Sequence, residues 1–166
     1  MVNKKLIILR VACFTLSLLI MVFIFSMSAQ DAETSSNTSG GLIESVIRFF
    51  DKGFAELSQI EQEEYVGKFQ FIVRKLAHFS VYLALGFALS AGMQTFVKLR
   101  VFVRTLFAFI IGVLYAILDE IHQIFVPGRS CELRDMLIDS TGILIGSLFI
   151  MALFLLIKRT KNKAVV

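Results

Sequence analysis

The sequence predicts an all-α, polytopic membrane protein: a four-transmembrane-helix bundle with both termini cytoplasmic and a long helical outer loop between helices 1 and 2. Two observations predict this class. The 166 residues are 57% hydrophobic and only 18% charged, and their mean hydropathy is +0.78, whereas soluble domains are about 45–50% apolar and about 25% charged. The apolar residues also gather in four runs, each about as long as a membrane-spanning helix. At this length we expect a single domain over residues 1–166.

A helix needs about 20 apolar residues to cross the hydrocarbon core of a bilayer. The four runs predict helices at about 6–27, 76–97, 101–124 and 136–157, and an outer loop at about 28–72. The first run follows Lys4 and Lys5, so a cleaved signal peptide is an alternative for it. Its length favours a retained helix.

Basic residues orient the bundle, because Lys and Arg near helix ends collect on the cytoplasmic side. They precede the first run, separate the second from the third and follow the fourth, which places both termini on the cytoplasmic side of the membrane. All thirteen acidic residues lie on the other side or in the helix ends that face it. The basic residues are Lys4, Lys5, Arg10, Lys98, Arg100, Arg104, Lys158, Arg159, Lys161 and Lys163.

The outer loop contains two kinds of sequence. Residues 28–41 are rich in Ser, Thr, Asn and Gly, which is typical of turn or coil. Apolar residues then recur at helical spacing over 42–54, which predicts a short amphipathic helix on the outer interface, and 56–71 has the character of a second one. A helical hairpin packed over the bundle is the alternative.

The second predicted membrane helix begins with a polar face. Arg74, His78 and Tyr82 are spaced by four residues and therefore share one side of the helix, with Lys75 beside them. This face is cationic at the membrane surface and phenolic deeper in.

The third predicted helix ends with Asp119, Glu120, His122 and Gln123. Asp119, His122 and Gln123 share one face by three-and-four spacing. Ionisable groups at the centre of a bilayer cost about 2.5–3.5 kcal/mol each on insertion scales and usually face the bundle interior.

The fourth predicted helix follows a Pro127-Gly128 turn and opens with Asp135 and Asp139, which are four residues apart. Gly142 and Gly146 then form a small-xxx-small pair, which lets a neighbouring helix approach closely. Arg129 and Arg134 lie near the start of this helix.

Counting the crossings places all three polar clusters in one outer layer. We expect the basic residues there to neutralise the acidic ones. The candidate catalytic residues are His78, Asp119, Glu120, His122 and Asp139; the candidate ligand-binding residues are Arg74, Lys75, Tyr82, Gln123, Arg129, Arg134 and Asp135.

Other classes of site are not indicated. The basic clusters lie beside apolar runs and do not alternate with aromatic residues, which argues against a nucleic-acid partner. Cys13 and Cys131 make no disulfide or metal pattern. No metal site is predicted, although His78 and His122 would be its ligands if there were one. The sequence does not identify a cofactor.

The combined motifs resemble the VanZ-like family of bacterial membrane proteins. The residues that carry the resemblance are Phe25 to Gln30, Arg74, Lys75, Ala77, His78, Phe79, Tyr82, Asp119, Glu120, His122, Gln123, Pro127, Gly128, Arg129, Asp135, Asp139, Gly142 and Gly146. The resemblance implies a multi-pass protein of the bacterial cell membrane and a role linked to teicoplanin susceptibility. It does not bring a settled activity.

Three functions remain as alternatives. In the first, the outer layer is an active site for a lipid-linked or cell-wall substrate, with Glu120 or Asp119 as base and His78 or His122 as its acid–base partner. In the second, the same pocket binds such a ligand without chemistry. The third is a transporter subunit, which would require a homo-oligomer. It ranks last because no polar path continues through the inner half of the predicted helices.

Overall fold

The computed structural model describes residues 4–163, and this part of the chain contains helices and no strand. Four helices are long and apolar enough to cross a membrane, so the predicted fold class is confirmed. In chain order the elements are α1 (Lys4–Ser28), α2 (Ala32–Phe50), the 3-10 helix η1 (Lys52–Glu56), α3 (Gln59–Gln94), α4 (Val101–Gln123) and α5 (Leu133–Lys163).

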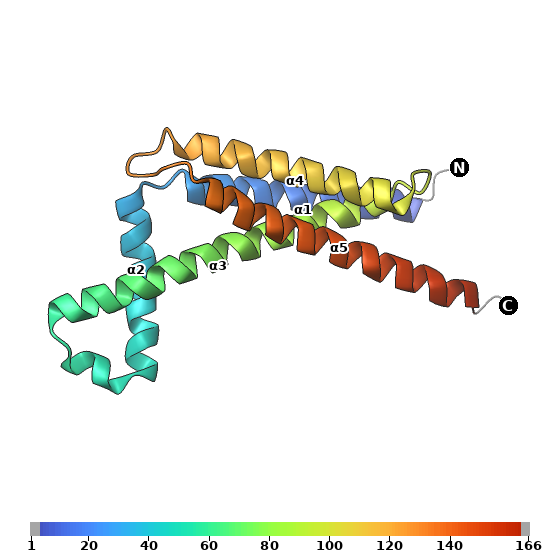
Figure 1. Ribbon diagram of the computed structural model, residues 1–166. Helices are drawn as coiled ribbons and strands as arrows, with labels where there is room; N and C mark the ends of the chain where they lie inside the picture. Colours follow the sequence, from blue (N-terminus) through green and yellow to red (C-terminus); the bar gives the residue numbers. More distant parts are fainter. Residues whose placement is uncertain (1–3, 164–166) are drawn as a thin grey trace.

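The helices α1, α4, α5 and the C-terminal part of α3 form the bundle (Figure 1). α1 begins and α5 ends at the same end of it, as four crossings require, and the cytoplasmic position of this end remains a prediction. At the opposite end α1 and α4 finish and α5 starts. We call this opposite end, marked by Ser28, Gln123 and Leu133, the polar end.

Glycines let α3 and α5 cross in direct backbone contact. A Cβ atom added to Gly142 would lie 2.7 Å from the carbonyl oxygen of Phe79, and one on Gly86 would lie 2.5 Å from that of Ile143. Gly146 meets the backbone of Leu83 in the same way. The predicted small-xxx-small pair therefore serves packing within the chain.

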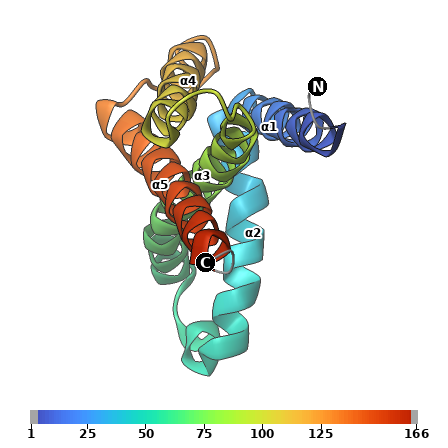
Figure 2. The ribbon, with the colours of Figure 1, turned by 90° about the vertical axis from the view of Figure 1, so that its right-hand side faces the viewer.

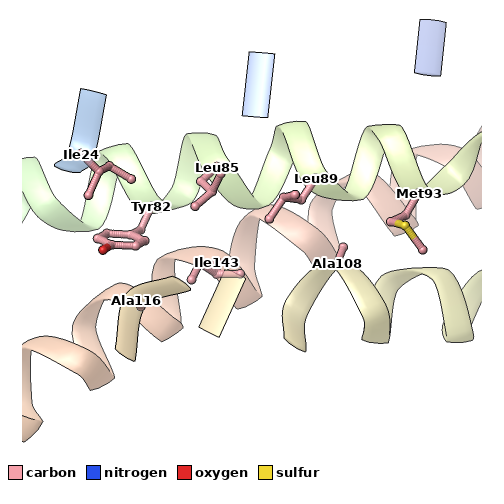
Figure 3. Packing of buried hydrophobic residues seen from close by; sticks show 8 residues of the cluster. All are labelled: Ile24, Tyr82, Leu85, Leu89, Met93, Ala108, Ala116 and Ile143. Atoms are coloured by element: carbon pink, nitrogen blue, oxygen red, sulfur yellow. The ribbon is translucent and has the colours of Figure 1, made fainter. Parts of the chain in front are cut away.

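The apolar core lies along α3, inside the bundle. Figure 3 shows Tyr82, Leu85, Leu89 and Met93 following one another on this helix, while Ile143 of α5 fills the space beside them. Ile24 of α1 and two alanines of α4, Ala108 and Ala116, complete the cluster.

The outer loop is a turn only over residues 29–31 and is helical from Ala32, so the expectation of turn or coil was wrong for residues 32–41. α2 begins at Ala32, whose backbone N–H donates to the Pro127 carbonyl at 3.2 Å. Asp31 caps the helix by accepting from the backbone N–H of Thr34 at 2.7 Å. An N-cap and a tertiary contact thus outweigh the weak helix propensity of the Ser-, Thr- and Gly-rich segment.

The second membrane helix also starts earlier than predicted. α3 begins at Gln59, where Ser58 and Glu61 form a capping box. Its first turns extend beyond the bundle and pack against α2, around a small core of Ile43, Ile47 and Phe54. α2 runs across the bundle direction beside the polar end (Figures 1 and 2). The loop therefore forms a helical hairpin that extends beyond the bundle, and its position on the outer interface stays a prediction.

Candidate functional site

The three polar clusters meet at the polar end, as the crossings predicted. Two cavities lie there, one of about 300 Å³ with a mostly polar wall and one of about 290 Å³ with a mostly apolar wall. Three side chains line both cavities: Arg74 and His78 of α3 and Arg129 from the turn before α5. The polar cavity is also lined by Lys75, Gln123 and Asp135, and the apolar one by Tyr82.

Arg74 and Arg129 lack carboxylate partners. Within the described residues neither forms an ion pair, and the hydrogen bond found for Arg129 runs from its Nε to the Gln30 carbonyl at 3.2 Å. Burial and then the positive charge of Arg74 lower the pKa of Arg129 below its ordinary value, but a guanidinium remains charged. Two cations therefore line one cavity, and neither is paired with a carboxylate within 4.0 Å among the described residues, although Glu132 and Asp135 also line this cavity.

The expected neutralisation of the acidic residues is realised only in part. Lys75 pairs with Asp135, and its Nζ also lies 4.0 Å from Glu132. Arg134 pairs with Glu132 at 3.5 Å. These contacts tie the start of α5 to α3 and to its own first turn, which is an ordinary structural role. Asp119, Glu120 and Asp139 receive no Lys or Arg within 4.0 Å among the described residues.

Asp119 is buried at the junction of α1, α3 and α4. Its Oδ2 accepts hydrogen bonds from Ser28 Oγ at 2.8 Å and from Tyr82 OH at 3.1 Å, while Oδ1 has no partner. Tyr82 thus lines the apolar cavity and also donates a hydrogen bond to the carboxylate of Asp119. This network connects the ends of α1 and α4 to the middle of α3.

Glu120 is fully buried and holds the α4–α5 connection. Its Oε2 accepts from the backbone N–H of Glu132 at 3.0 Å, and its Oε1 accepts from Gln123 Nε2 at 3.3 Å. Both oxygens are occupied, so the structure favours a positioning role for this predicted base.

Asp139 is the least satisfied acidic side chain at the polar end. It is 0% exposed, and neither carboxylate oxygen has a hydrogen-bond partner in the described part of the chain. The nearest basic group is His78, whose Nδ1 lies 3.9 Å from Asp139 Oδ2. Because an unpaired buried carboxylate is costly, Asp139 is a candidate for a functional role.

His122 does not join this arrangement. Its ring stacks on Phe25 of α1 at a centroid distance of 4.4 Å, its Nε2 has no partner in the described residues, and it lines neither cavity. A metal site would need a cluster of ligands, and no group of three or more His, Cys, Asp or Glu fit to hold a metal ion occurs in residues 4–163. The arrangement of His78, His122 and a carboxylate is thus not formed.

Two residues of the site were not among the candidates predicted from the sequence. Ser28 of α1 is buried and donates a hydrogen bond to Asp119, and the backbone carbonyl of Gln30 accepts a hydrogen bond from Arg129. Both belong to the segment Phe25 to Gln30 at the end of α1, which carried part of the family resemblance, but no spacing rule connects this segment to residues about 90 positions later.

Comparison with known proteins identifies the family. A family model described as VanZ/LLP1 matches residues 13–156. The chain belongs to the VanZ/LLP1 family. The matched region includes all four membrane helices for most of their length and every residue of the site. A search of curated proteins and a search of solved structures each returned no match.

Proposed function

We propose that this VanZ/LLP1 protein binds and acts on a cell-envelope ligand, lipid-linked or derived from peptidoglycan, at the outer face of the bacterial plasma membrane. The ligand carries a phosphate or carboxylate group. The observation that supports this most is the pair of guanidinium groups, Arg74 and Arg129, which face the same cavity without a carboxylate partner. Arg favours phosphate and carboxylate because its planar fork binds two oxygens at once.

The rest of the polar cavity suits a headgroup. Lys75 lies at its wall but is already paired with Asp135, so the two arginines are the cations of the cavity that have no ion-pair partner among the described residues. Gln123 adds an amide to the lining. A cavity of about 300 Å³ is at the small end of ligand sites, which is appropriate for a charged headgroup and not for a whole cell-wall precursor.

His78 and Asp139 are the residues best placed for chemistry on such a ligand. Asp139 lies behind Nδ1 of His78, which leaves Nε2 as the nitrogen that can serve the cavity. A carboxylate in that position orients an imidazole and stabilises its protonated form. The separation of 3.9 Å is longer than a hydrogen bond and would shorten when a ligand closes the site.

Family membership supports a second, cellular proposal, a role in teicoplanin susceptibility. A protein that binds or alters an envelope ligand at the outer face would change which envelope molecules a glycopeptide antibiotic can bind there. The cell-based readout is the teicoplanin concentration that inhibits growth, measured with and without expression of this chain.

Native mass spectrometry of the protein extracted with its membrane lipids tests the binding proposal. We expect an anionic lipid or lipid-linked species on the wild type and its loss from the double variant Arg74→Ala with Arg129→Ala. Arg48→Ala is the matched control, because Arg48 is on the same side of the bundle but pairs with Glu44 in α2. Equal retention by the double variant and the control would refute the proposal.

The variant Asp139→Asn distinguishes a catalytic protein from one that binds the ligand without catalysis. If His78 and Asp139 act on the ligand, this variant still binds the species seen on the wild type but loses the effect on teicoplanin inhibition. A fully retained cellular effect would leave the non-catalytic binding protein as the function.

A further inference from the structure

The apolar cavity has no role in binding a charged headgroup. It lies between α1 and α3 and has about the same size as the polar cavity, about 290 Å³. Its walls are hydrophobic side chains of the two helices: Phe23, Ile24 and Met27 from α1, and Val73, Ala77 and Val81 from α3. Tyr82 and Ile24 belong to the buried core, where they lie close together (Figure 3).

The two cavities are joined by the residues that carry the charge. Arg74, His78 and Arg129 line both, so the two arginines that form no ion pair among the described residues lie where the polar wall changes into the apolar one. Serines of α2, Ser35 and Ser39, and Gln30 complete the wall of the apolar cavity. A molecule that is charged at one end and apolar along its length would match both compartments.

The apolar cavity also borders the lipid-facing surface. Phe23 of α1 and Val73 of α3 are 53% and 42% exposed, and Met27 is 44% exposed, so the cavity is open between the two helices. In a bilayer the part of this opening beside Phe23 and Val81 meets hydrocarbon, because these residues lie within the predicted spans 6–27 and 76–97, while Val73 lies at the membrane surface. A lipid can therefore reach the site sideways without leaving the membrane.

We infer that the apolar cavity holds the hydrocarbon chain of the same ligand whose anionic headgroup occupies the polar cavity, and that this ligand is a membrane lipid with a phosphate group and an extended chain. The inference rests on the proposed function, because the headgroup must first bind Arg74 and Arg129. It excludes a water-soluble anion as the complete ligand.

Binding of two probes to the purified full chain in a non-ionic detergent tests the inference. The probes are dodecyl phosphate and ethyl phosphate, which share a headgroup and differ in chain length. Each buried methylene favours binding, so we expect the wild type to bind dodecyl phosphate at least about a hundredfold more tightly than ethyl phosphate.

Ala77→Phe fills the apolar cavity from a position that is exposed and therefore has room for a ring. We expect this variant to bind dodecyl phosphate about tenfold more weakly, as loss of a few buried methylenes would cause, and to bind ethyl phosphate with an affinity unchanged within about twofold. Leu76→Phe is the control, because Leu76 is the exposed neighbour on α3 and lines neither cavity.

The outcomes separate the two proposals. If Ala77→Phe binds dodecyl phosphate as the wild type does, the chain site is refuted while the headgroup site stands. If the double variant Arg74→Ala with Arg129→Ala binds both probes as tightly as the wild type, the headgroup site itself is refuted.

A second measurement does not depend on how Ala77→Phe folds. A dodecyl phosphate with a photoreactive group at the end of its chain, cross-linked to the wild type, should label Phe23 or Val81, which lie deeper along α1 and α3 than Met27 and Val73. Labelling confined to the outer surfaces of α4 or α5 would overturn the inference.

Discussion

Buried or half-buried arginines lie at both ends of this bundle, and their surroundings differ. At the end opposite the polar one, Arg104 donates to the backbone carbonyls of Leu99, Val97 and Gln94, which are left free where α3 ends. At the polar end, Arg129 donates to a single carbonyl, that of Gln30, and Arg74 forms no ion pair among the described residues. Arg104 is 5% exposed, yet its hydrogen bonds close the turn after α3 and its guanidinium lies 5.7 Å from the centre of the Phe154 ring, so its role is structural.

The comparison shows that burial and charge do not by themselves identify a functional residue. What separates the two ends is whether the donors and acceptors are already used. Glu120 and Asp139 repeat the contrast within the polar end, since both are 0% exposed but only Glu120 has hydrogen-bond partners among residues 4–163. Unused groups in a cavity are the ones available to a ligand.

The largest effect on stability is expected from Arg104→Ala. This variant removes the hydrogen-bond donors of three carbonyl groups at the turn between α3 and α4. A fully buried acceptor that loses its partner costs about 1–3 kcal/mol. Because water reaches part of this turn, we expect a loss of about 3 kcal/mol in the free energy of unfolding, measured in detergent, with wild-type binding of dodecyl phosphate. Weakened binding at unchanged stability would contradict the assignment of Arg104 to structure.

The two buried carboxylates should respond in opposite directions to loss of their charge. Glu120→Gln places an amide where two donors now bind, which we expect to destabilise the protein by about 2 kcal/mol. Asp139→Asn removes a buried charge that has no hydrogen-bond partner in the described residues, and should leave stability unchanged or higher. Thermal unfolding of both variants checks this; equal destabilisation would mean that Asp139 is a structural residue too.

Among the arginine variants, the smaller effect on stability is expected from Arg129→Ala. One hydrogen bond to Gln30 is lost, which costs at most about 1 kcal/mol. The same change should weaken the binding of dodecyl phosphate about tenfold or more, because a charge-assisted hydrogen bond to phosphate is among the strongest that a side chain makes. A large fall in the unfolding midpoint would show that Arg129, like Arg104, holds the fold.

Several elements of the site could be predicted and others could not. Arg74, His78 and Tyr82 do line one cavity, as their spacing predicted. His122 shares a face with Asp119 by the same rule but stacks on Phe25, because α1 packs against that part of α4. The helix α2 was missed at its start, since the Asp31 cap and the contact of Ala32 with Pro127 outweigh the composition of the segment.

The sequence by itself determined the four membrane helices and the gathering of polar residues at one end. A bilayer requires about 20 apolar residues for each crossing and internal hydrogen bonding of the backbone, so hydropathy alone specifies the spans. Only the tertiary structure decided which charges pair. The close crossing of α3 and α5 at Gly142 and Gly146 determines the separation of the side chains on those helices. Lys75 therefore meets Asp135, while Arg74, one residue earlier, faces the cavity without a partner of opposite charge among the described residues.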